Sequence, residues 1–150
     1  MDRAETATDG SIGGDRSASL RLLGSRVLIV EDEVIVAMDL QNTLEDEGAE
    51  VVGPAYTLDQ AIAFASQADI SAAILDLRIG RDSAAPVARL LTARNIPFVF
   101  YTGQSRSDLL LSEWPKTRVL SKPSPGLELV AAAAAMLSAG SGRREQRESD

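Results

Sequence analysis

The sequence predicts an α/β fold in which helices cover both faces of a doubly wound, five-stranded parallel sheet. Short apolar runs alternate along the chain with segments whose apolar residues recur at helical spacing. The runs are continuously apolar, which is typical of parallel strands buried on both faces. Charged or hydroxyl residues follow several of these runs, at the strand ends where open α/β sheets build their binding sites.

The expected strands and helices follow one another in alternation. Strands are predicted from apolar and β-branched runs, at residues 27–30, 50–54, 70–76, 97–101 and 118–121. Helices are predicted from apolar residues at helical spacing, at residues 34–47, 57–66, 82–94, 105–113 and 127–138. Right-handed crossovers then bring the ends of the first, third, fourth and fifth strands to one rim of the sheet.

Start and stop signals support the helix ends. Gly48 follows the first helix as a C-terminal stop, and Thr57-Leu-Asp-Gln60 has the pattern of a capping box that opens the second. Asp82 and Ser83 cap the third helix, in which Pro86 is acceptable because it falls in the first turn. Five consecutive alanines strongly favour the last helix, whereas the fourth has the weakest pattern.

The folded domain is expected to span residues 25–139. Residues 1–24 are predicted to be a flexible tail, because most of them are small, polar or charged and bury little apolar surface. Within this tail, Leu20, Leu22 and Leu23 form a short segment that could pack back on the domain. The polar residues 140–150 are predicted to be a second flexible tail. So few residues after the last helix indicate a stand-alone domain without an output module.

The composition excludes several classes of function. The chain has 22 acidic and 15 basic residues and a net charge of −7, which disfavours direct binding to nucleic acid. It has no cysteine and no histidine, which excludes thiol catalysis and Ser-His-Asp chemistry. No run approaches the roughly 20 apolar residues of a membrane span, and the N-terminus lacks the layout of a signal peptide. We therefore expect a cytoplasmic protein that binds neither nucleic acid nor membrane.

Five polar side chains are expected to lie together at the rim of the predicted sheet. They are Glu31, Asp32, Asp76, Thr102 and Lys122. Three neighbouring carboxylates repel one another and need a cation, and oxygen ligands select a hard ion such as Mg²⁺. Lys122 and Thr102 offer a positive charge and a hydrogen-bond donor for a phosphoryl group. Asp76 emerges singly from its strand and is the candidate nucleophile that forms an aspartyl phosphate.

Four short motifs in this order resemble those of the response-regulator receiver domain. They are Val-Leu-Ile-Val-Glu31-Asp32-Glu, Ala-Ile-Leu-Asp76-Leu, Phe-Val-Phe-Tyr-Thr102-Gly and Leu-Ser-Lys122-Pro123. The resemblance covers residues 27–138 and implies the flavodoxin-like fold of the bacterial chemotaxis regulator, with strand order 2-1-3-4-5. It also implies a phosphoprotein of a two-component system, which takes part in phosphorelay signal transduction.

The resemblance assigns a role to each matching residue. Asp76 would be the phosphoacceptor, while Thr102 and Lys122 would contact the phosphoryl group. The Mg²⁺ ligands would be Asp32, Asp76, the backbone carbonyl of Arg78 and, through water, Glu31. The peptide bond between Lys122 and Pro123 is usually cis in this family.

The resemblance also implies the partners of the domain. Because the chain has no histidine, the phosphoryl group would come from a sensor histidine kinase or a histidine phosphotransfer protein. The output would be contact with an unidentified target protein, as a relay, a phosphate sink or a regulator. Ile35 and Val36 would either dock a partner helix or pack in the core. The last helix, apolar nearly all round, is either deeply buried or the face of a homodimer.

Some positions depart from the family pattern. Val119 stands where receivers commonly carry the aromatic residue of a coupled switch, and residues 77–83 differ from the usual loop after the phosphoacceptor. The run from Phe100 to Gly103 only partly resembles the Phe-Ala-Thr-Gly subclass. We expect no enzymatic activity beyond self-phosphorylation and self-dephosphorylation. The alternatives are an adaptor that works without phosphorylation and an aspartyl-phosphate phosphatase, which would need an acid at Arg78.

Overall fold

The computed structural model describes residues 20–103 and 109–149 of the chain. Five parallel strands form the central sheet, and they are β1 (Arg26–Val30), β2 (Glu50–Ala55), β3 (Ala72–Leu75), β6 (Phe98–Thr102) and β7 (Val119–Ser121). The helices are α2 (Val34–Asp46), α3 (Leu58–Gln67), α4 (Ala85–Ala93), the 3₁₀ helix η1 (Leu109–Glu113) and α5 (Gly126–Ser149). The strand order β2-β1-β3-β6-β7 confirms the predicted doubly wound sheet and its order.

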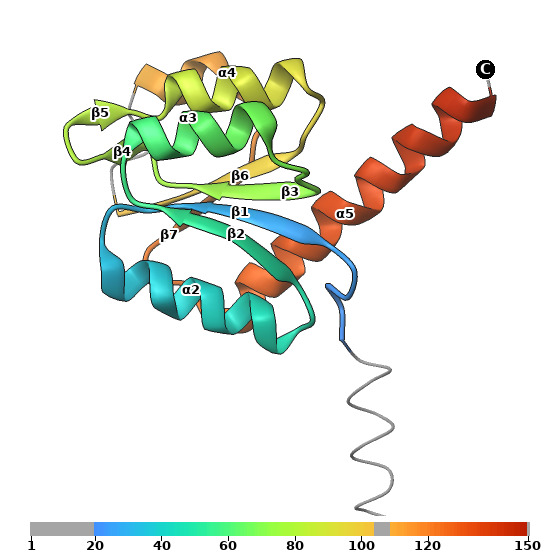
Figure 1. Ribbon diagram of the computed structural model, residues 1–150, viewed down its shortest axis with the longest axis horizontal. Coiled ribbons are helices and arrows are strands. Elements are labelled where there is room, and N and C mark those ends of the chain that lie inside the picture. Colours follow the sequence, from blue (N-terminus) through green and yellow to red (C-terminus); the bar gives the residue numbers. More distant parts are fainter. Residues whose placement is uncertain (1–19, 104–108, 150) are drawn as a thin grey trace, which may run out of the picture.

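The sheet is buried on both faces, as its continuous apolar strands predict (Figure 1). Helices α3 and α4 pack side by side over one face, and α2 and α5 cover the other. Along β1, successive side chains point to opposite faces. Leu28 therefore belongs to the core beneath α3 and α4, whereas Ile29 belongs to the core beneath α2 and α5. Each face of the sheet therefore has its own hydrophobic core.

The last helix contributes its apolar side to the second of these cores. Its buried residues there are Leu129, Val130, Ala132, Ala133 and Met136. Burial against the sheet thus accounts for the apolar stripe of α5. No helix of the described part of the chain is both long and apolar enough to cross a membrane.

The second helix begins as its capping box predicts. Thr57 is the N-cap of α3, and its hydroxyl accepts a hydrogen bond from the backbone N–H of Gln60 at 3.1 Å. The side chain of Gln60 reaches back and accepts from the backbone N–H of Tyr56 at 2.8 Å. These bonds satisfy N–H groups that the first turn of a helix leaves without a partner.

A small hairpin replaces the predicted start of the third helix. Strand β4 (Arg78–Ile79) pairs antiparallel with β5 (Asp82–Ser83), and Gly80 in the connection has φ +64°. The helix α4 consequently begins only at Ala85, so the predicted start at Asp82 is wrong. Ala84 is the N-cap of α4, and the hydroxyl of Ser83 before it accepts a hydrogen bond from the backbone N–H of Ala85 at 3.1 Å.

The described part of the predicted fourth helix is a 3₁₀ helix and not an α-helix. This part is η1, and residues 104–108 lie outside the described residues. Arg89 of α4 makes two hydrogen bonds of 2.9 Å to the carboxylate of Glu113 at the end of η1. The indole N–H of Trp114 donates to the hydroxyl of Thr92 at 3.1 Å. These contacts fix the segment of η1 and Trp114 to α4.

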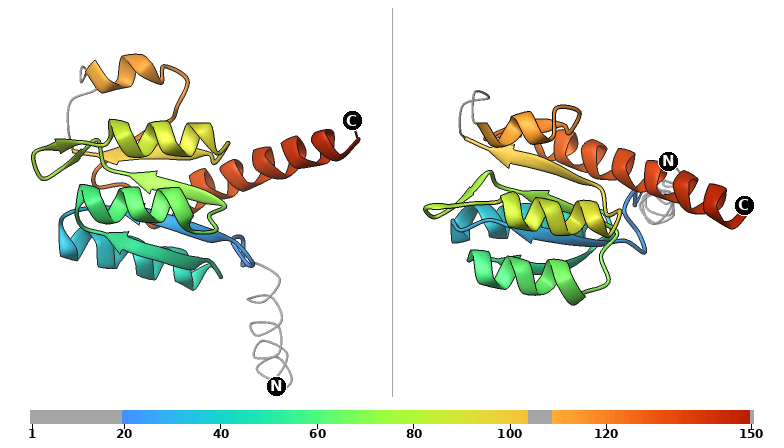
Figure 2. Two further views of the ribbon diagram at one scale, coloured as in Figure 1. Left: turned by 45° about the horizontal axis from the view of Figure 1, so that its top comes forward. Right: turned by 90° about the horizontal axis from the view of Figure 1, so that it is seen from above.

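Ordered elements are described on both sides of residues 25–139, the predicted domain. Leu22 is fully buried in the core and its backbone N–H donates to the carbonyl of Glu47, so ordered structure begins before residue 25. At the other end, α5 continues to Ser149, through residues predicted as a tail. Arginine, glutamate and glutamine are good helix formers and dominate this stretch despite its two glycines. Figure 2 shows the end of α5 projecting past the sheet. Residues 1–19 of the predicted N-terminal tail lie outside the described residues.

Candidate functional site: an acidic cluster with a lysine

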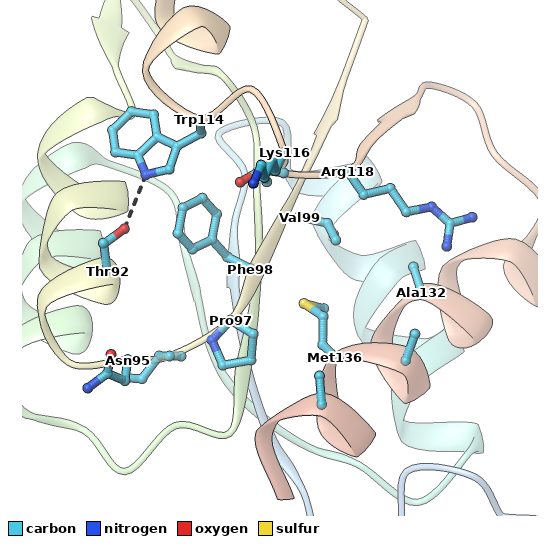
Figure 3. Close-up of a pocket in the computed structure, with 14 residues that line it drawn as sticks. Thr92, Asn95, Pro97, Phe98, Val99, Trp114, Lys116, Arg118, Ala132 and Met136 are labelled. Atoms are coloured by element: carbon cyan, nitrogen blue, oxygen red, sulfur yellow. Dashed lines mark hydrogen bonds between the residues drawn. The ribbon is translucent and has the colours of Figure 1, made fainter. Parts of the chain in front are cut away.

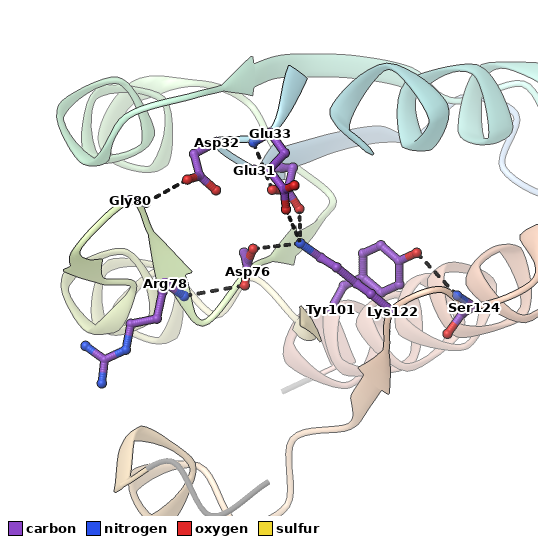
Figure 4. Close-up of polar contacts among 9 residues, drawn as sticks. All are labelled: Glu31, Asp32, Glu33, Asp76, Arg78, Gly80, Tyr101, Lys122 and Ser124. Atoms are coloured by element: carbon purple, nitrogen blue, oxygen red, sulfur yellow. Dashed lines mark hydrogen bonds and ion pairs between the residues drawn. The ribbon is translucent and has the colours of Figure 1, made fainter. Parts of the chain in front are cut away.

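The carboxyl ends of the central strands converge at one edge of the sheet. Val30 pairs with Leu75, and the backbone N–H of Asp76 donates to the carbonyl of Val30 at 3.0 Å. On the other side, the backbone N–H of Lys122 donates to the carbonyl of Thr102 at 3.0 Å. This register sets the first residues after β1, β3 and β7 level with one another. Residues far apart in the sequence therefore meet at this edge, as predicted (Figure 4).

Three carboxylates form a compact cluster at this edge. One oxygen from each of Glu31, Asp32 and Asp76 lies within 4.8 Å of the others. Glu31 is 1% exposed and Asp76 is 7% exposed, whereas Asp32 is half-buried at the rim. An all-oxygen, negatively charged donor set fits a hard divalent cation. The cluster is thus compatible with a divalent metal site.

Lys122 brings a positive charge into the same cluster. Its Nζ atom lies 2.8 Å from an oxygen of Asp76, donates a short hydrogen bond to Glu31, and is 3.8 Å from Glu33. Burial alone would lower the pKa of Lys122, but its hydrogen bonds to Asp76 and Glu31 outweigh burial and raise this pKa. The ammonium group therefore stays charged among the carboxylates.

Burial shifts the pKa of Glu31 in the opposite direction to that of Lys122. Burial raises the pKa of Glu31, because a charged carboxylate loses hydration there. The hydrogen bonds from Lys122 and from the backbone N–H of Glu33 lower this pKa but offset only part of the burial effect. The charge on Glu31 thus depends on the lysine that faces it.

The unpredicted β4–β5 hairpin holds one of the acids. The backbone N–H of Gly80 donates to Asp32 at 2.9 Å, and that of Arg78 lies 3.4 Å from an oxygen of Asp76. The side chain of Arg78 points away from the cluster (Figure 4). Gly80 was missed as a contributor to the site, because the two-residue strands on either side of it are too short to show a strand pattern. Glu33 was also missed, and only its position next to the predicted acids could have indicated it.

The hydroxyl and aromatic residues of β6 flank the lysine. Thr102 is 2% exposed at the end of this strand, level with Ser121 of β7. The Nζ atom of Lys122 lies over the ring of Tyr101, 5.7 Å from its centroid. The hydroxyl of Tyr101 accepts a hydrogen bond from the backbone N–H of Ser124 at 3.3 Å. The Lys122–Pro123 peptide bond is cis, as the resemblance implies.

The two residues expected to dock a partner lie in different environments. Ile35 is 81% exposed at the start of α2, close in sequence to the acidic cluster. Val36 is half-buried and packs against the core beneath α2 and α5. Val34 and Met38 are also exposed, at 53% and 52%. Ile35 therefore belongs to an apolar surface with Val34 and Met38, while Val36 belongs to the interior.

A separate groove of about 480 Å³ lies at the opposite end of β6 (Figure 3). Phe98, Trp114 and Met136 form its apolar wall, and Lys116 and Arg118 also line it. None of the carboxylates of the acidic cluster lines this groove. The groove and the cluster are therefore distinct features of the molecule.

Comparisons with known proteins agree with this arrangement. The family model of the response regulator receiver domain matches residues 27–134. The transcriptional regulatory protein PdtaR of Mycobacterium tuberculosis is 35% identical over 86 residues, which cover 57% of this chain and 42% of PdtaR. The chain thus matches less than half the length of that curated relative.

Solved structures show the same fold. The response regulator PhyR from Brucella abortus superposes with a TM-score of 0.72 and 26% identity, covering 92% of this chain and 58% of PhyR. A response regulator receiver protein from Sinorhizobium medicae superposes with a TM-score of 0.70 and 27% identity, covering 81% of this chain and 99% of that protein.

Proposed function

This chain belongs to the response regulator receiver domain family, and on that premise we propose that Asp76 accepts a phosphoryl group from a phosphohistidine of a partner protein. The observation that carries the proposal is the position of Asp76 between a lysine and two further acids. Its carboxylate lies 2.8 Å from the Nζ atom of Lys122 and within 4.8 Å of Glu31 and Asp32. Such a site can hold both a metal ion and a phosphoryl group.

Mg²⁺ is the cofactor we propose. Asp32, Asp76 and the backbone carbonyl of Arg78 would hold it directly, and Glu31 through water. When bound, the ion supplies positive charge that offsets the charge of the phosphoryl oxygens. The half-buried Asp32, kept in place by the backbone N–H of Gly80, leaves this position open to solvent and so to exchange of the ion.

The residues of the site promote phosphoryl transfer to Asp76 by aligning the reacting groups and by offsetting their charge. A carboxylate oxygen of Asp76 attacks the phosphorus, the bond between phosphorus and the donor imidazole nitrogen breaks, and the imidazole leaves with its electron pair. The Nζ atom of Lys122 leaves the carboxylate of Asp76 and donates a hydrogen bond to a phosphoryl oxygen of the product. The hydroxyl of Thr102 donates a hydrogen bond to another phosphoryl oxygen. Phosphoryl transfer needs this kind of alignment more than further covalent chemistry.

The partner is a sensor histidine kinase or a histidine phosphotransfer protein in this proposal. Ile35 supplies the exposed apolar contact at the start of α2, close in sequence to Glu31 and Asp32 of the acidic cluster. The output is contact with a target protein in the cytoplasm. The similarity to PdtaR, a transcriptional regulatory protein, supports a signalling role.

Intact mass spectrometry tests the proposal. The protein is incubated with a small acyl-phosphate donor, with and without Mg²⁺, beside Asp76→Asn and the matched control Asp82→Asn, which removes an exposed acid of β5. We expect one phosphoryl group on the wild type and on Asp82→Asn only when Mg²⁺ is present, and none on Asp76→Asn. If no carboxylate is phosphorylated with Mg²⁺ by this donor or by a kinase, the adaptor alternative is favoured.

A further inference from the structure

Tyr101 contacts both the lysine of the acidic cluster and the turn that follows it. The Nζ atom of Lys122 lies over its ring, 5.7 Å from the centroid. On the other side, its hydroxyl accepts a hydrogen bond from the backbone N–H of Ser124. Figure 4 shows the ring beside the lysine chain, with its hydroxyl toward the start of α5. One side chain therefore touches the turn at two points.

The register of the sheet explains this placement. Tyr101 pairs with Leu120 in the parallel ladder between β6 and β7. Lys122 lies two residues beyond Leu120, so its side chain leaves on the same face as that of Leu120. On that face, the Nζ atom of Lys122 reaches the ring of Tyr101. Tyr101 is 6% exposed, which leaves its ring little freedom to move away.

The lysine needs such a restraint because several carboxylates compete for it. The carboxylates of Glu31, Asp76 and Glu33 all lie within 4.0 Å of its Nζ atom. A lysine side chain has a flexible four-carbon stem, so charge alone does not select one position among these acids. The face of an aromatic ring attracts a cation and gives it one further fixed contact.

We propose that Tyr101 is a positioning residue for Lys122, and through it for phosphorylation of Asp76; this inference rests on the function proposed above. The ring holds the ammonium group toward Asp76, and the hydroxyl anchors the turn that carries the lysine. The turn has a second internal bond, from the hydroxyl of Ser124 to the carbonyl of Ser121 at 2.6 Å. With Val119 at the position where receivers commonly carry an aromatic, Tyr101 supplies an aromatic contact from the neighbouring strand.

A double-mutant cycle tests the inference. The initial rate of phosphorylation by a small acyl-phosphate donor with Mg²⁺ is measured for wild type, Tyr101→Leu, Lys122→Met and the double variant. We expect Tyr101→Leu to be about fivefold slower than wild type, the size of one cation–aromatic contact. In the Lys122→Met background the same change is expected to have no further effect, because Tyr101 acts through the lysine. Equal effects in both backgrounds would overturn the inference, since a purely structural role does not depend on Lys122.

Two further variants separate the ring from general packing. Tyr101→Phe keeps the ring and is expected to remain within about twofold of wild type. Phe98→Leu removes another aromatic side chain from β6, away from the acidic cluster, and should leave the rate unchanged. If Tyr101→Phe is as slow as Tyr101→Leu, or if Phe98→Leu is equally slow, the ring does not position the lysine.

Nuclear magnetic resonance supplies a readout on the folded wild type, should Tyr101→Leu fail to fold. The ring current of Tyr101 is expected to shift the ε-methylene protons of Lys122 upfield, and ordinary lysine shifts would overturn the inference. If the wild type itself accepts no phosphoryl group, the proposed function fails and this inference falls with it. If the wild type is phosphorylated but the cycle is additive, only the role of Tyr101 fails.

Discussion

The Nζ atom of Lys122 lies 2.8 Å from a carboxylate oxygen of Asp76, although 46 positions separate the two residues in the chain. The parallel ladder from β3 through β6 to β7 brings them together, since each strand ends at the same edge. The charge of Asp76 is thus compensated before any phosphoryl group arrives. Phosphorylation of Asp76 would require this lysine to change its contact, which couples the site to the turn after β7.

Replacing Lys122 with methionine is expected to lower the free energy of unfolding by about 2 kcal/mol. The carboxylates that face the lysine would remain buried without a positive charge to offset the loss of their hydration. Glu31, which is 1% exposed, is the acid most affected. Urea denaturation in the presence of a chelator measures the change. Lys116→Met, at an exposed position, is the control and should change stability by less than about 0.5 kcal/mol. A Lys122→Met protein as stable as the wild type would contradict the compensating role of the lysine.

Removing the charge of Asp32 is expected to weaken Mg²⁺ binding by roughly tenfold or more, because affinity for hard cations follows the number of charged oxygen ligands. Titration calorimetry of Asp32→Asn against wild type measures the dissociation constant. Asp82→Asn, in the exposed strand β5, is the matched control and should bind as the wild type does. If Asp32→Asn and Asp82→Asn bind Mg²⁺ equally well, the ion is not held at the acidic cluster.

Ile35→Asp is expected to slow phosphoryl transfer from a partner phosphohistidine while leaving the rate with a small acyl phosphate unchanged. Ile35 is 81% exposed, so its loss removes a contact surface without opening the core. Side-by-side transfer assays with the two donors measure the separation. Leu23→Asp, 69% exposed and beside Gly48 at the other end of α2, should leave both rates unchanged. Equal slowing with both donors would show damage to the site rather than lost docking.

Leu22→Ala is expected to lower the free energy of unfolding by about 2–3 kcal/mol, in the range of buried leucine truncations. Its side chain is fully buried, whereas the next residue, Leu23, is 69% exposed. Leu23→Ala is therefore the matched control and should cost less than about 0.5 kcal/mol. Urea denaturation of both variants measures the difference. Equal stabilities would mean that the segment before β1 contributes nothing to the core.

Because of the ion pair between Arg89 and Glu113, we expect the stability of the protein to depend slightly on pH in the acidic range. The hydrogen bond from Arg89 holds the pKa of Glu113 below its usual value. A carboxyl with a lowered folded-state pKa stabilises the protein above its unfolded-state pKa, and this contribution is lost as the pH falls through the folded-state value. The stability difference between wild type and Arg89→Gln should therefore shrink on acidification below about pH 4.5. Denaturation midpoints across that range measure it, and a constant difference would contradict the pairing.

The fold and the acidic cluster were predictable because their signals are local. The apolar runs that form β1, β3 and β6 are buried on both faces. The polar residues at their ends could be placed on one edge of the sheet by topology alone. The sequence predicts Glu31, Asp32 and Asp76 at this edge, and one oxygen from each lies within 4.8 Å of the others.

The hairpin, the burial of Leu22 and the contacts of Tyr101 depend on tertiary contacts that the sequence pattern does not indicate. Two-residue strands such as β4 and β5 have no periodicity, so the hairpin and the bond from Gly80 to Asp32 were missed. The segment with Leu20, Leu22 and Leu23 was expected to be able to pack back on the domain, but the sequence did not distinguish Leu22, which is buried, from Leu23, which is 69% exposed. The double contact of Tyr101 arises from the register of β6 and β7, which no local pattern records.

Borohydride reduction of the phosphorylated protein, followed by peptide mass spectrometry, identifies the acceptor most directly. Borohydride converts an acyl phosphate to an alcohol, so a phosphorylated aspartate is recovered as homoserine. After incubation with a small acyl-phosphate donor and Mg²⁺, we expect this conversion at Asp76, and none in the absence of the ion. Conversion at Asp32 or Glu31 in place of Asp76, or at no residue of the chain, would contradict the proposed phosphoacceptor.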